Sequence, residues 1–276
     1  MRTWALIVDT WREALARKTL LGFAGASTLF LLTVTFALDL DIVQGSLAAA
    51  TLFGHPLEMH GGPIAITEVV TGGLSAFAGL TYGLGIFLAV FATGNQVPNL
   101  MRRGTVDLYL SRPVSRSHVL LGRFLGGVTV VAANLLYLCG GLMVIVGVKT
   151  GVWEGRFILA ALLILVVFLS FLGFMYLVGV LSGSTPLSVM LSYGLWVISM
   201  PLAAHDKIAA AMDSRLSVAI VNGLYWVLPK TAELGRDIVR LVLDQGTPGA
   251  SALATTTAFG AVCLGLAVAL FRRKSF

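Results

Sequence analysis

Six long stretches of this chain contain no Asp, Glu, Lys or Arg. They cover residues 19–38, 72–92, 124–148, 157–182, 186–204 and 249–271. A helix needs about 20 residues to cross a bilayer, and each stretch is close to or above that length. Because the backbone groups of a lipid-embedded segment must hydrogen-bond within the segment, we expect these stretches to be helices. The sequence therefore predicts an all-α membrane protein with six transmembrane helices.

The composition excludes a soluble globular domain. Hydrophobic residues make up 57% of the chain and charged residues 12%, whereas soluble domains carry about 25% charged residues. The net charge of +6 does not indicate a nucleic-acid partner, because no basic patch interleaved with aromatic residues lies on a soluble segment. Cys139 and Cys263 fall inside predicted spans, where an apolar cysteine usually packs as a small hydrophobic side chain.

Residues 1–18 form a charged, amphipathic segment ahead of the first span. Trp4 and Trp11 share its apolar side with aliphatic residues at spacings of three and four, which predicts a helix lying in the membrane interface. No small-residue cleavage site follows, so we expect the first span to be retained as an anchor. The segment either orients this span or acts as a mechanical element, and we favour the first interpretation. Residues 19–276 then form a single six-span domain.

Most of the 19 Lys and Arg residues lie in the N-terminal segment, in the loop at residues 93–118 and in the C-terminal tail. With six spans, these three regions share one side of the membrane. Positive residues concentrate on the cytoplasmic side, so both termini and this loop are predicted to be cytoplasmic. Short helices broken by Pro98 and Pro113 are expected in the loop, with Thr105 and Asp107 at the start of one of them.

Two segments are predicted on the outer side. Residues 39–71 contain no Lys or Arg, and the sequence predicts no fold for them. Within residues 205–247, the apolar run 216–228 is too short to span the membrane, and Pro229 ends it. An amphipathic helix follows. We therefore expect an outer re-entrant helical hairpin that dips back toward the membrane from outside.

Catalytic and energy-coupling motifs are missing from the sequence. It contains no G-x-x-x-x-G-K-[ST] phosphate loop and no H-E-x-x-H zinc motif. The predicted spans hold no paired Asp and no ionisable residue, whereas a proton- or sodium-coupled carrier keeps such residues at membrane depth. We therefore expect no catalytic activity in this chain, and we expect a partner protein to supply the energy for transport.

The polar and small residues inside the spans have structural explanations. Asn134, in the third span, is expected to hydrogen-bond to a neighbouring helix. The pairs Gly79 with Gly83 and Gly179 with Gly183 have the spacing that permits close helix approach. Because the chain has 31 glycines, such pairs also arise by chance.

The outer segment gathers potential metal ligands in His55, Met59 and His60. Ligand type without geometry is a poor guide to metal binding. An exposed polar loop is the simpler interpretation, so we predict no metal site and keep these three residues as weak candidates.

Residues 103–116 read Arg-Gly-Thr-Val-Asp-Leu-Tyr-Leu-Ser-Arg-Pro-Val-Ser-Arg, and residues 120–123 read Leu-Leu-Gly-Arg. This stretch closely resembles a Gly-Thr … Leu-Leu-Leu-Ser-Arg-Pro-Val-Ser-Arg … Leu-Leu-Gly-Lys/Arg segment in permeases of type 2 ATP-binding-cassette (ABC) exporters. These include the permease linked to copper-site maturation of nitrous oxide reductase. The six-span layout, interfacial helix, outer hairpin and basic tail are similar too, so the resemblance covers essentially the whole chain. One departure is Met101-Arg102-Arg103, where many relatives carry acidic residues.

The resemblance implies a transmembrane permease subunit that pairs with a second permease copy, as a homodimer or heterodimer, and with separate ABC ATPase subunits. ATP and Mg²⁺ would bind in the ATPase, and this chain would hold no cofactor. A cytoplasmic coupling helix in residues 93–118 would contact the ATPase. The implied ATPase-coupling residues are Thr105, Val106, Asp107, Leu108, Tyr109, Leu110, Arg112 and Arg116. The implied location is the inner membrane of a bacterial or archaeal cell.

Uncharged spans favour export of a lipid-like, amphipathic or hydrophobic substrate over a small ion. One alternative is a membrane subunit that transmits ATPase motion to a periplasmic partner through residues 205–247, without moving cargo. A polytopic membrane enzyme is a second alternative, which the missing catalytic motifs disfavour. Membrane lipids complete the expected partners.

Overall fold

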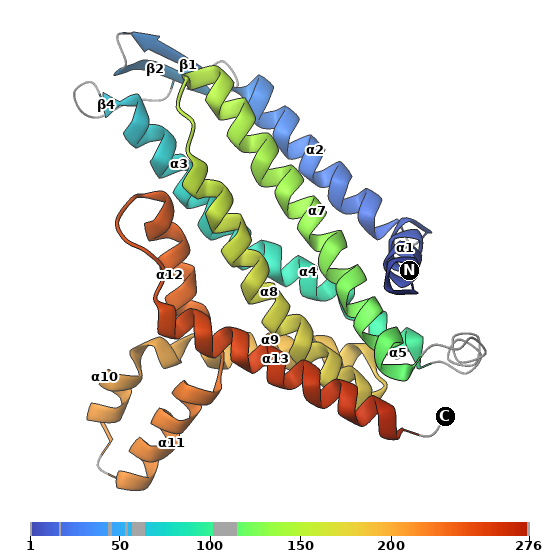
Figure 1. Cartoon of the computed structure of the whole chain (residues 1–276). Coiled ribbons are helices and arrows are strands. Elements are labelled where there is room, and N and C mark those ends of the chain that lie inside the picture. Colours follow the sequence, from blue (N-terminus) through green and yellow to red (C-terminus); the bar gives the residue numbers. More distant parts are fainter. Residues whose placement is uncertain are drawn as a thin grey trace.

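The computed structural model of the chain describes residues 2–16, 18–43, 46–52, 55–56, 64–101, 115–212 and 214–274. This part of the chain is an elongated helical bundle with both termini at one end and a small sheet at the other (Figure 1). The helices are α1 (Arg2–Ala16), α2 (Thr19–Ala37), α3 (Ile66–Leu80), η1 (Thr81–Gly85, a π-helical turn), α4 (Ile86–Thr93), α5 (Gln96–Leu100), α7 (Arg116–Thr150), α8 (Gly155–Ser182), α9 (Thr185–Ser199), η2 (Pro201–Ala204, 3₁₀), α10 (His205–Ala210), α11 (Arg215–Val227), α12 (Thr231–Val242) and α13 (Ala250–Arg273).

A small antiparallel sheet lies between the end of α2 and the start of α3 (Figure 1). Its strands are β1 (Leu38–Val43), β2 (Ser46–Leu52), β3 (His55–Pro56) and β4 (Ile64–Ala65), and β2 pairs with each of the others. The membrane-crossing part of the described chain is helical, as predicted. The sheet adds a β element in the segment for which the sequence predicts no fold.

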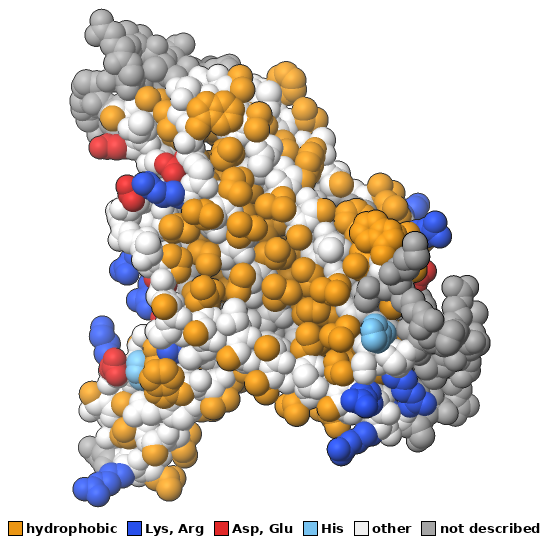
Figure 2. All heavy atoms as spheres, in the orientation of Figure 1, with side chains coloured by type: hydrophobic (Ala, Val, Ile, Leu, Met, Phe, Trp, Pro, Cys, Tyr) orange, Lys and Arg blue, Asp and Glu red, His pale blue; other side chains and the backbone are white. Residues whose placement is uncertain are grey.

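Within the described residues, five helical segments are long and apolar enough to cross a membrane. They are Ile66–Leu100, Arg116–Thr150, Gly155–Ser182, Thr185–Ala210 and Ala250–Arg273. The pair Trp4–Ala16 and Leu21–Phe36, bent by 70°, brings the number to six. α2 has 19 residues, or about 28 Å at 1.5 Å per residue, which nearly matches a hydrocarbon core of roughly 30 Å. Figure 2 shows hydrophobic side chains over the middle of one face and charged groups toward its margins.

α8 is the central helix of the bundle and packs against α3, α4, α7, α9, α12 and α13. α8 and α13 cross closely at Gly173 and Gly260, where an added Cβ would come 2.5 Å from backbone atoms of the other helix. Ser170 Oγ donates a hydrogen bond to the Thr256 carbonyl oxygen at 2.7 Å beside this crossing. Glycine at both positions therefore permits backbone contact between the two helices.

Residues 183–186 read Gly-Ser-Thr-Pro, which predicts a tight turn between two helices, and the structure confirms this turn between α8 and α9. Gly183 adopts the left-handed conformation with φ 65° and caps α8, and Ser184 precedes α9. Pro186 lies in the first turn of α9. The predicted fifth span, residues 186–204, lies within the candidate span Thr185–Ala210, which changes from the α-helix α9 to a 3₁₀ turn at Pro201. A proline lacks the N–H that a continuing helix requires.

Helix extends into both ends of the predicted loop at residues 93–118. Pro98 does not break a helix there as expected, because it lies inside α5. α7 begins at Arg116, eight residues before the predicted span at 124–148. The positions of both ends differ because the charged first turn of α7 lies outside the uncharged window that defined the span. Residues 102–114, the remainder of the loop, lie outside the described residues.

The outer hairpin consists of α11 and α12, but only one limb packs into the bundle. α11, all of whose residues are described, has no buried residue. α12 buries Leu234, Ile238 and Val242 against α3 and α8. The one-sided apolar face of α12 matches a packed helix surface. The expected dip of the hairpin toward the membrane stays a prediction.

Lys230 is a buried cation that the sequence analysis does not anticipate. Its backbone N–H donates to Thr256 Oγ1 at 3.0 Å, which places it level with Ser170 near the middle of α8. The side chain is buried, and its ammonium lies 3.9 Å from the Tyr225 ring centroid and 4.5 Å from that of Trp226. The sequence assigns residues 205–247 to an outer loop, which is why this lysine is missed.

Candidate functional site at the end that holds both termini

Seven of the eight predicted ATPase-coupling residues fall within residues 102–114, outside the described residues. They are Thr105, Val106, Asp107, Leu108, Tyr109, Leu110 and Arg112. The eighth, Arg116, is the first residue of α7. The structure therefore describes the two supports of the coupling segment, α5 before it and α7 after it. These supports define the candidate site.

The α5 side of the segment is fixed to α8. Gln96 Oε1 accepts a hydrogen bond of 2.7 Å from the Tyr176 hydroxyl. Val97 and Leu100 are buried, and an added Cβ at Gly179 of α8 would come 3.0 Å from Val97. α5 is short, so these tertiary contacts, rather than its own propensity, hold it in place.

The α7 side begins with a capped helix. Ser115 Oγ accepts a hydrogen bond from the His118 backbone N–H at 3.4 Å and lies 2.6 Å from His118 Nδ1. A serine at this position satisfies one of the free N–H groups of the first turn. The end of the coupling segment is thereby attached to a 35-residue helix that crosses the whole bundle.

α1 packs on this same end of α7. The Arg123 guanidinium is ion-paired with Glu13 of α1 and lies 3.5 Å from Asp9 Oδ2, and only 6% of its side chain is exposed. Trp11 Nε1 donates to Thr129 Oγ1 at 3.0 Å. Buried Arg–carboxylate pairs fix orientation as well as position. A motion of the first turns of α7 is therefore transmitted to α1.

Two glycines of α7 allow α1 to approach closely. An added Cβ at Gly122 would lie 2.6 Å from Leu6 Cδ1, and one at Gly126 would lie 2.5 Å from Thr10 Cβ. Both contacts are to side chains buried between the helices. α1 therefore lies directly on α7 in addition to flanking the membrane.

Lys274, just after α13, joins the two supports. Its Nζ donates to the Val180 carbonyl oxygen at 2.7 Å and lies 3.8 Å from Met101 Sδ, at the start of the coupling segment. Its own carbonyl oxygen accepts a hydrogen bond from Arg116 Nη1, at the end of the segment. Lys274 thus connects both flanks of residues 102–114 with α8.

The sequence analysis finds Arg116 but misses the contacts that hold α7 in place. Asp9 and Glu13 are four residues apart on the polar side of α1, and Arg123 is the last residue of the Leu-Leu-Gly-Arg motif. The opposite charges of these residues are a signal that the sequence does contain. The contacts of Lys274 leave no comparable signal, because they depend on where α13 ends in space.

The described residues contain no group of three or more His, Cys, Asp or Glu side chains that could hold a metal ion. His55 lies in β3, and its side chain is not described, while Met59 and His60 lie outside the described residues. Their candidacy as ligands stays untested.

A family model described as ABC-2 family transporter protein matches residues 34–276. The chain belongs to the ABC-2 transporter family. It is thus a multi-pass membrane permease subunit of an ABC transporter, a non-catalytic transport subunit, and membership implies an ABC ATPase partner. The match includes the supports α5 and α7 and the C-terminal Lys274 of this ABC-2 permease. No curated protein matches the chain.

Proposed function

We propose that this ABC-2 permease exports a lipid-like, amphipathic or hydrophobic substrate with energy from ATP hydrolysed by a separate ABC ATPase. The ATPase, which holds ATP and Mg²⁺, docks on the loop at residues 93–118, which contains residues 102–114. The observation that carries the proposal is the junction of α5, α7, α8, α1 and the C-terminus around this segment. A displacement of the segment pulls on helices that cross the bundle.

The apolar character of the spans supports the proposed substrate class. Apart from the cluster of Arg116, Arg123 and Lys274, the described residues include one further buried cation, Lys230. Its ammonium lies against two aromatic rings. A pathway for small ions would require charged or polar side chains along its length. A second permease copy completes the transporter in this proposal, with both termini cytoplasmic in a bacterial or archaeal inner membrane.

The experiment compares the reconstituted permease alone, with its cognate ATPase, and with an ATPase whose phosphate-loop Lys is replaced. We expect no nucleotide hydrolysis by the permease alone and coupled hydrolysis with the intact ATPase. Hydrolysis should be absent when the mutated ATPase replaces the intact one. Substrate accumulation by the permease alone, driven by a proton or sodium gradient, would contradict the proposal.

A second candidate function is transmission of ATPase motion to a periplasmic partner. The favouring observation is α11, which exposes Leu216, Trp226 and Val227 by 72%, 62% and 63%. The resemblance to the nitrous oxide reductase maturation permease points the same way. Co-purification of a periplasmic protein that is lost on Trp226→Ser would support this function, and ATP-dependent export from vesicles lacking any periplasmic protein would exclude it.

A further inference from the structure

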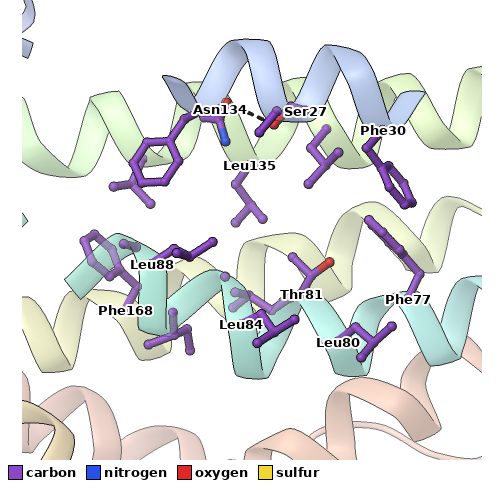
Figure 3. A pocket seen from close by; sticks show the side chains of 18 residues that line it. Ser27, Phe30, Phe77, Leu80, Thr81, Leu84, Leu88, Asn134, Leu135 and Phe168 are labelled. Atoms are coloured by element: carbon purple, nitrogen blue, oxygen red, sulfur yellow. Dashed lines mark hydrogen bonds between the residues drawn. The ribbon is translucent and has the colours of Figure 1, made fainter. Parts of the chain in front are cut away.

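A groove crosses the middle of the bundle between α2 and α7 on one side and α3, η1 and α4 on the other. Figure 3 shows the two walls, with Phe30 and Asn134 on the first and Phe77, Thr81 and Leu84 on the second. Its volume is ≈ 380 Å³, within the range of about 300–1,000 Å³ that small-molecule sites occupy. Size alone would also fit a surface hollow filled by bilayer lipid, so the lining chemistry decides its use.

The lining is apolar except for two polar patches that face each other. One patch is Asn134 with Ser27, whose Oγ donates to Asn134 Oδ1 at 3.3 Å. The opposite patch is Thr81 in η1. The other described lining residues are Ala, Gly, Val, Ile, Leu and Phe. The rim is open, since Leu80 and Leu84 are 60% and 63% exposed.

Asn134 has hydrogen-bonding capacity to spare. Figure 3 shows its amide nitrogen turned from Ser27 toward the opposite wall. Within the described part of the chain, neither this Nδ2 nor the Thr81 hydroxyl makes a hydrogen bond. Both residues lie near the middle of long helical segments, α7 and Ile66–Leu100. A polar group without a partner is costly in the bilayer core, where water is absent.

The depth of this pair selects the ligand. Ester oxygens and headgroups of an ordinary phospholipid lie at the interface, about 15 Å from the centre of a 30 Å core. A hydroxyl both accepts and donates hydrogen bonds, so it suits the amide nitrogen of Asn134 as well as the hydroxyl of Thr81. Because none of the described residues that line the groove is charged, a charged group would be poorly solvated there.

We propose that this groove binds an uncharged long-chain lipid by its hydroxyl oxygen, with Asn134 and Thr81 as its hydrogen-bonding residues. The inference rests on the proposed lipid-like substrate class and gives that class a chemistry and a place. The π-helical turn forms the binding wall, as such turns often do at functional sites. Tyr82, which follows Thr81 in this turn, donates a hydrogen bond to the Thr231 carbonyl oxygen of α12. Occupancy of the groove is thereby linked to the outer limb.

The test uses the full-length permease in vesicles with two photoreactive probes, a diazirine-bearing octadecanol and the matching diazirine octadecane. We expect the alcohol to label peptides from α2 and η1 about threefold more than the hydrocarbon, as one membrane hydrogen bond implies. Asn134→Leu should remove this preference and leave hydrocarbon labelling unchanged. Equal labelling of the wild type by both probes, or a preference that survives Asn134→Leu, would overturn the inference.

Filling the groove gives an independent arm. Ala26→Trp should lower labelling severalfold, whereas Leu32→Trp, on α2 but not among the lining residues, should not. Should Ala26→Trp fail to fold, Leu84→Trp fills the groove from the opposite wall. Labelling that the groove-filling variant does not change would identify annular lipid only and overturn the site. The assay needs no ATPase, so this failure would leave ATP coupling intact, and failed ATP coupling would leave the groove result intact.

Discussion

The Tyr82 hydroxyl donates a 2.5 Å hydrogen bond to the Thr231 carbonyl oxygen, joining the π-helical turn of the second span to the first residue of α12. The same ring lies against Gly235, where an added Cβ would come 2.7 Å from Tyr82 Cε1. The opposite end of α12 is held by Arg156, whose Nη2 lies 2.8 Å from Asp244 Oδ2. α12 is therefore attached to the rest of the bundle near both of its ends, at Thr231 and at Asp244.

Tyr82→Phe should loosen the deep end of α12, because the Thr231 carbonyl oxygen loses its donor. The expected cost is about 0.6 kcal/mol, typical of a hydrogen bond between membrane helices. Hydrogen exchange of α12 amides should accelerate. Tyr193→Phe is the matched control, since it removes a similar 2.8 Å bond to the Phe87 carbonyl oxygen on another helix pair. Equal effects of the two variants on α12 would refute the attachment.

Arg123→Gln should destabilise the protein by about 3 kcal/mol or more, because it removes the buried guanidinium that is ion-paired with Glu13. Arg156→Gln should cost at most about 1 kcal/mol, since this ion pair is largely exposed, with 41% and 70% of its two side chains accessible. Thermal unfolding of both variants in the same detergent measures the difference. Equal losses would show that the contact of α1 with α7 is not a structural junction.

Gly260→Ala should destabilise the crossing of α8 and α13 by about 1–3 kcal/mol, the usual cost of overpacking. The added methyl group would meet the Ser170 Cα at 2.5 Å, and backbone cannot move aside as a flexible side chain can. Gly265→Ala, on the same helix with nothing within 4 Å, should be neutral. An unfolding temperature unchanged by Gly260→Ala would contradict the tight crossing.

The orientation in the membrane is tested by cysteine labelling in a background lacking Cys139 and Cys263. Cysteines at Ser115 and Ser275 should react only from the cytoplasm, and cysteines at Gly61 and Gly246 only from outside. The reason is the concentration of Lys and Arg on the side of the termini. Reaction of the Gly61 variant from the cytoplasmic side would reverse the orientation.

The sequence predicts the helices well because lipid leaves the backbone few alternatives. The apolar windows locate the spans, Gly183 and Pro186 locate a turn, and Pro229 separates α11 from α12. The hydrogen bond of Asn134 to a neighbouring helix is confirmed by its contact with Ser27. These features depend on local chemistry, which a single sequence displays directly.

Packing between distant segments could not be predicted in the same way. Gly83 belongs to a pair with close-approach spacing, yet a Cβ added there would have nothing within 4 Å. The backbone contact between α8 and α13 uses Gly173 and Gly260 instead. The depth of Lys230 follows from the contacts of α12, which hydropathy does not encode. The supports Glu13 and Lys274 are likewise far from residues 102–114 in sequence and close to their flanks only in the fold.

The central claim is that residues 102–114 couple an ABC ATPase to the permease, and ATPase affinity measured on single variants tests it most directly. Tyr109→Ala and Leu110→Ala should each weaken ATPase binding by about 2 kcal/mol, roughly 30-fold, with parallel loss of ATPase stimulation. Leu32→Ala, at a 48% exposed position on α2, is the control and should change neither. Full ATPase binding and stimulation by both coupling-segment variants, expressed and folded as wild type, would contradict the account.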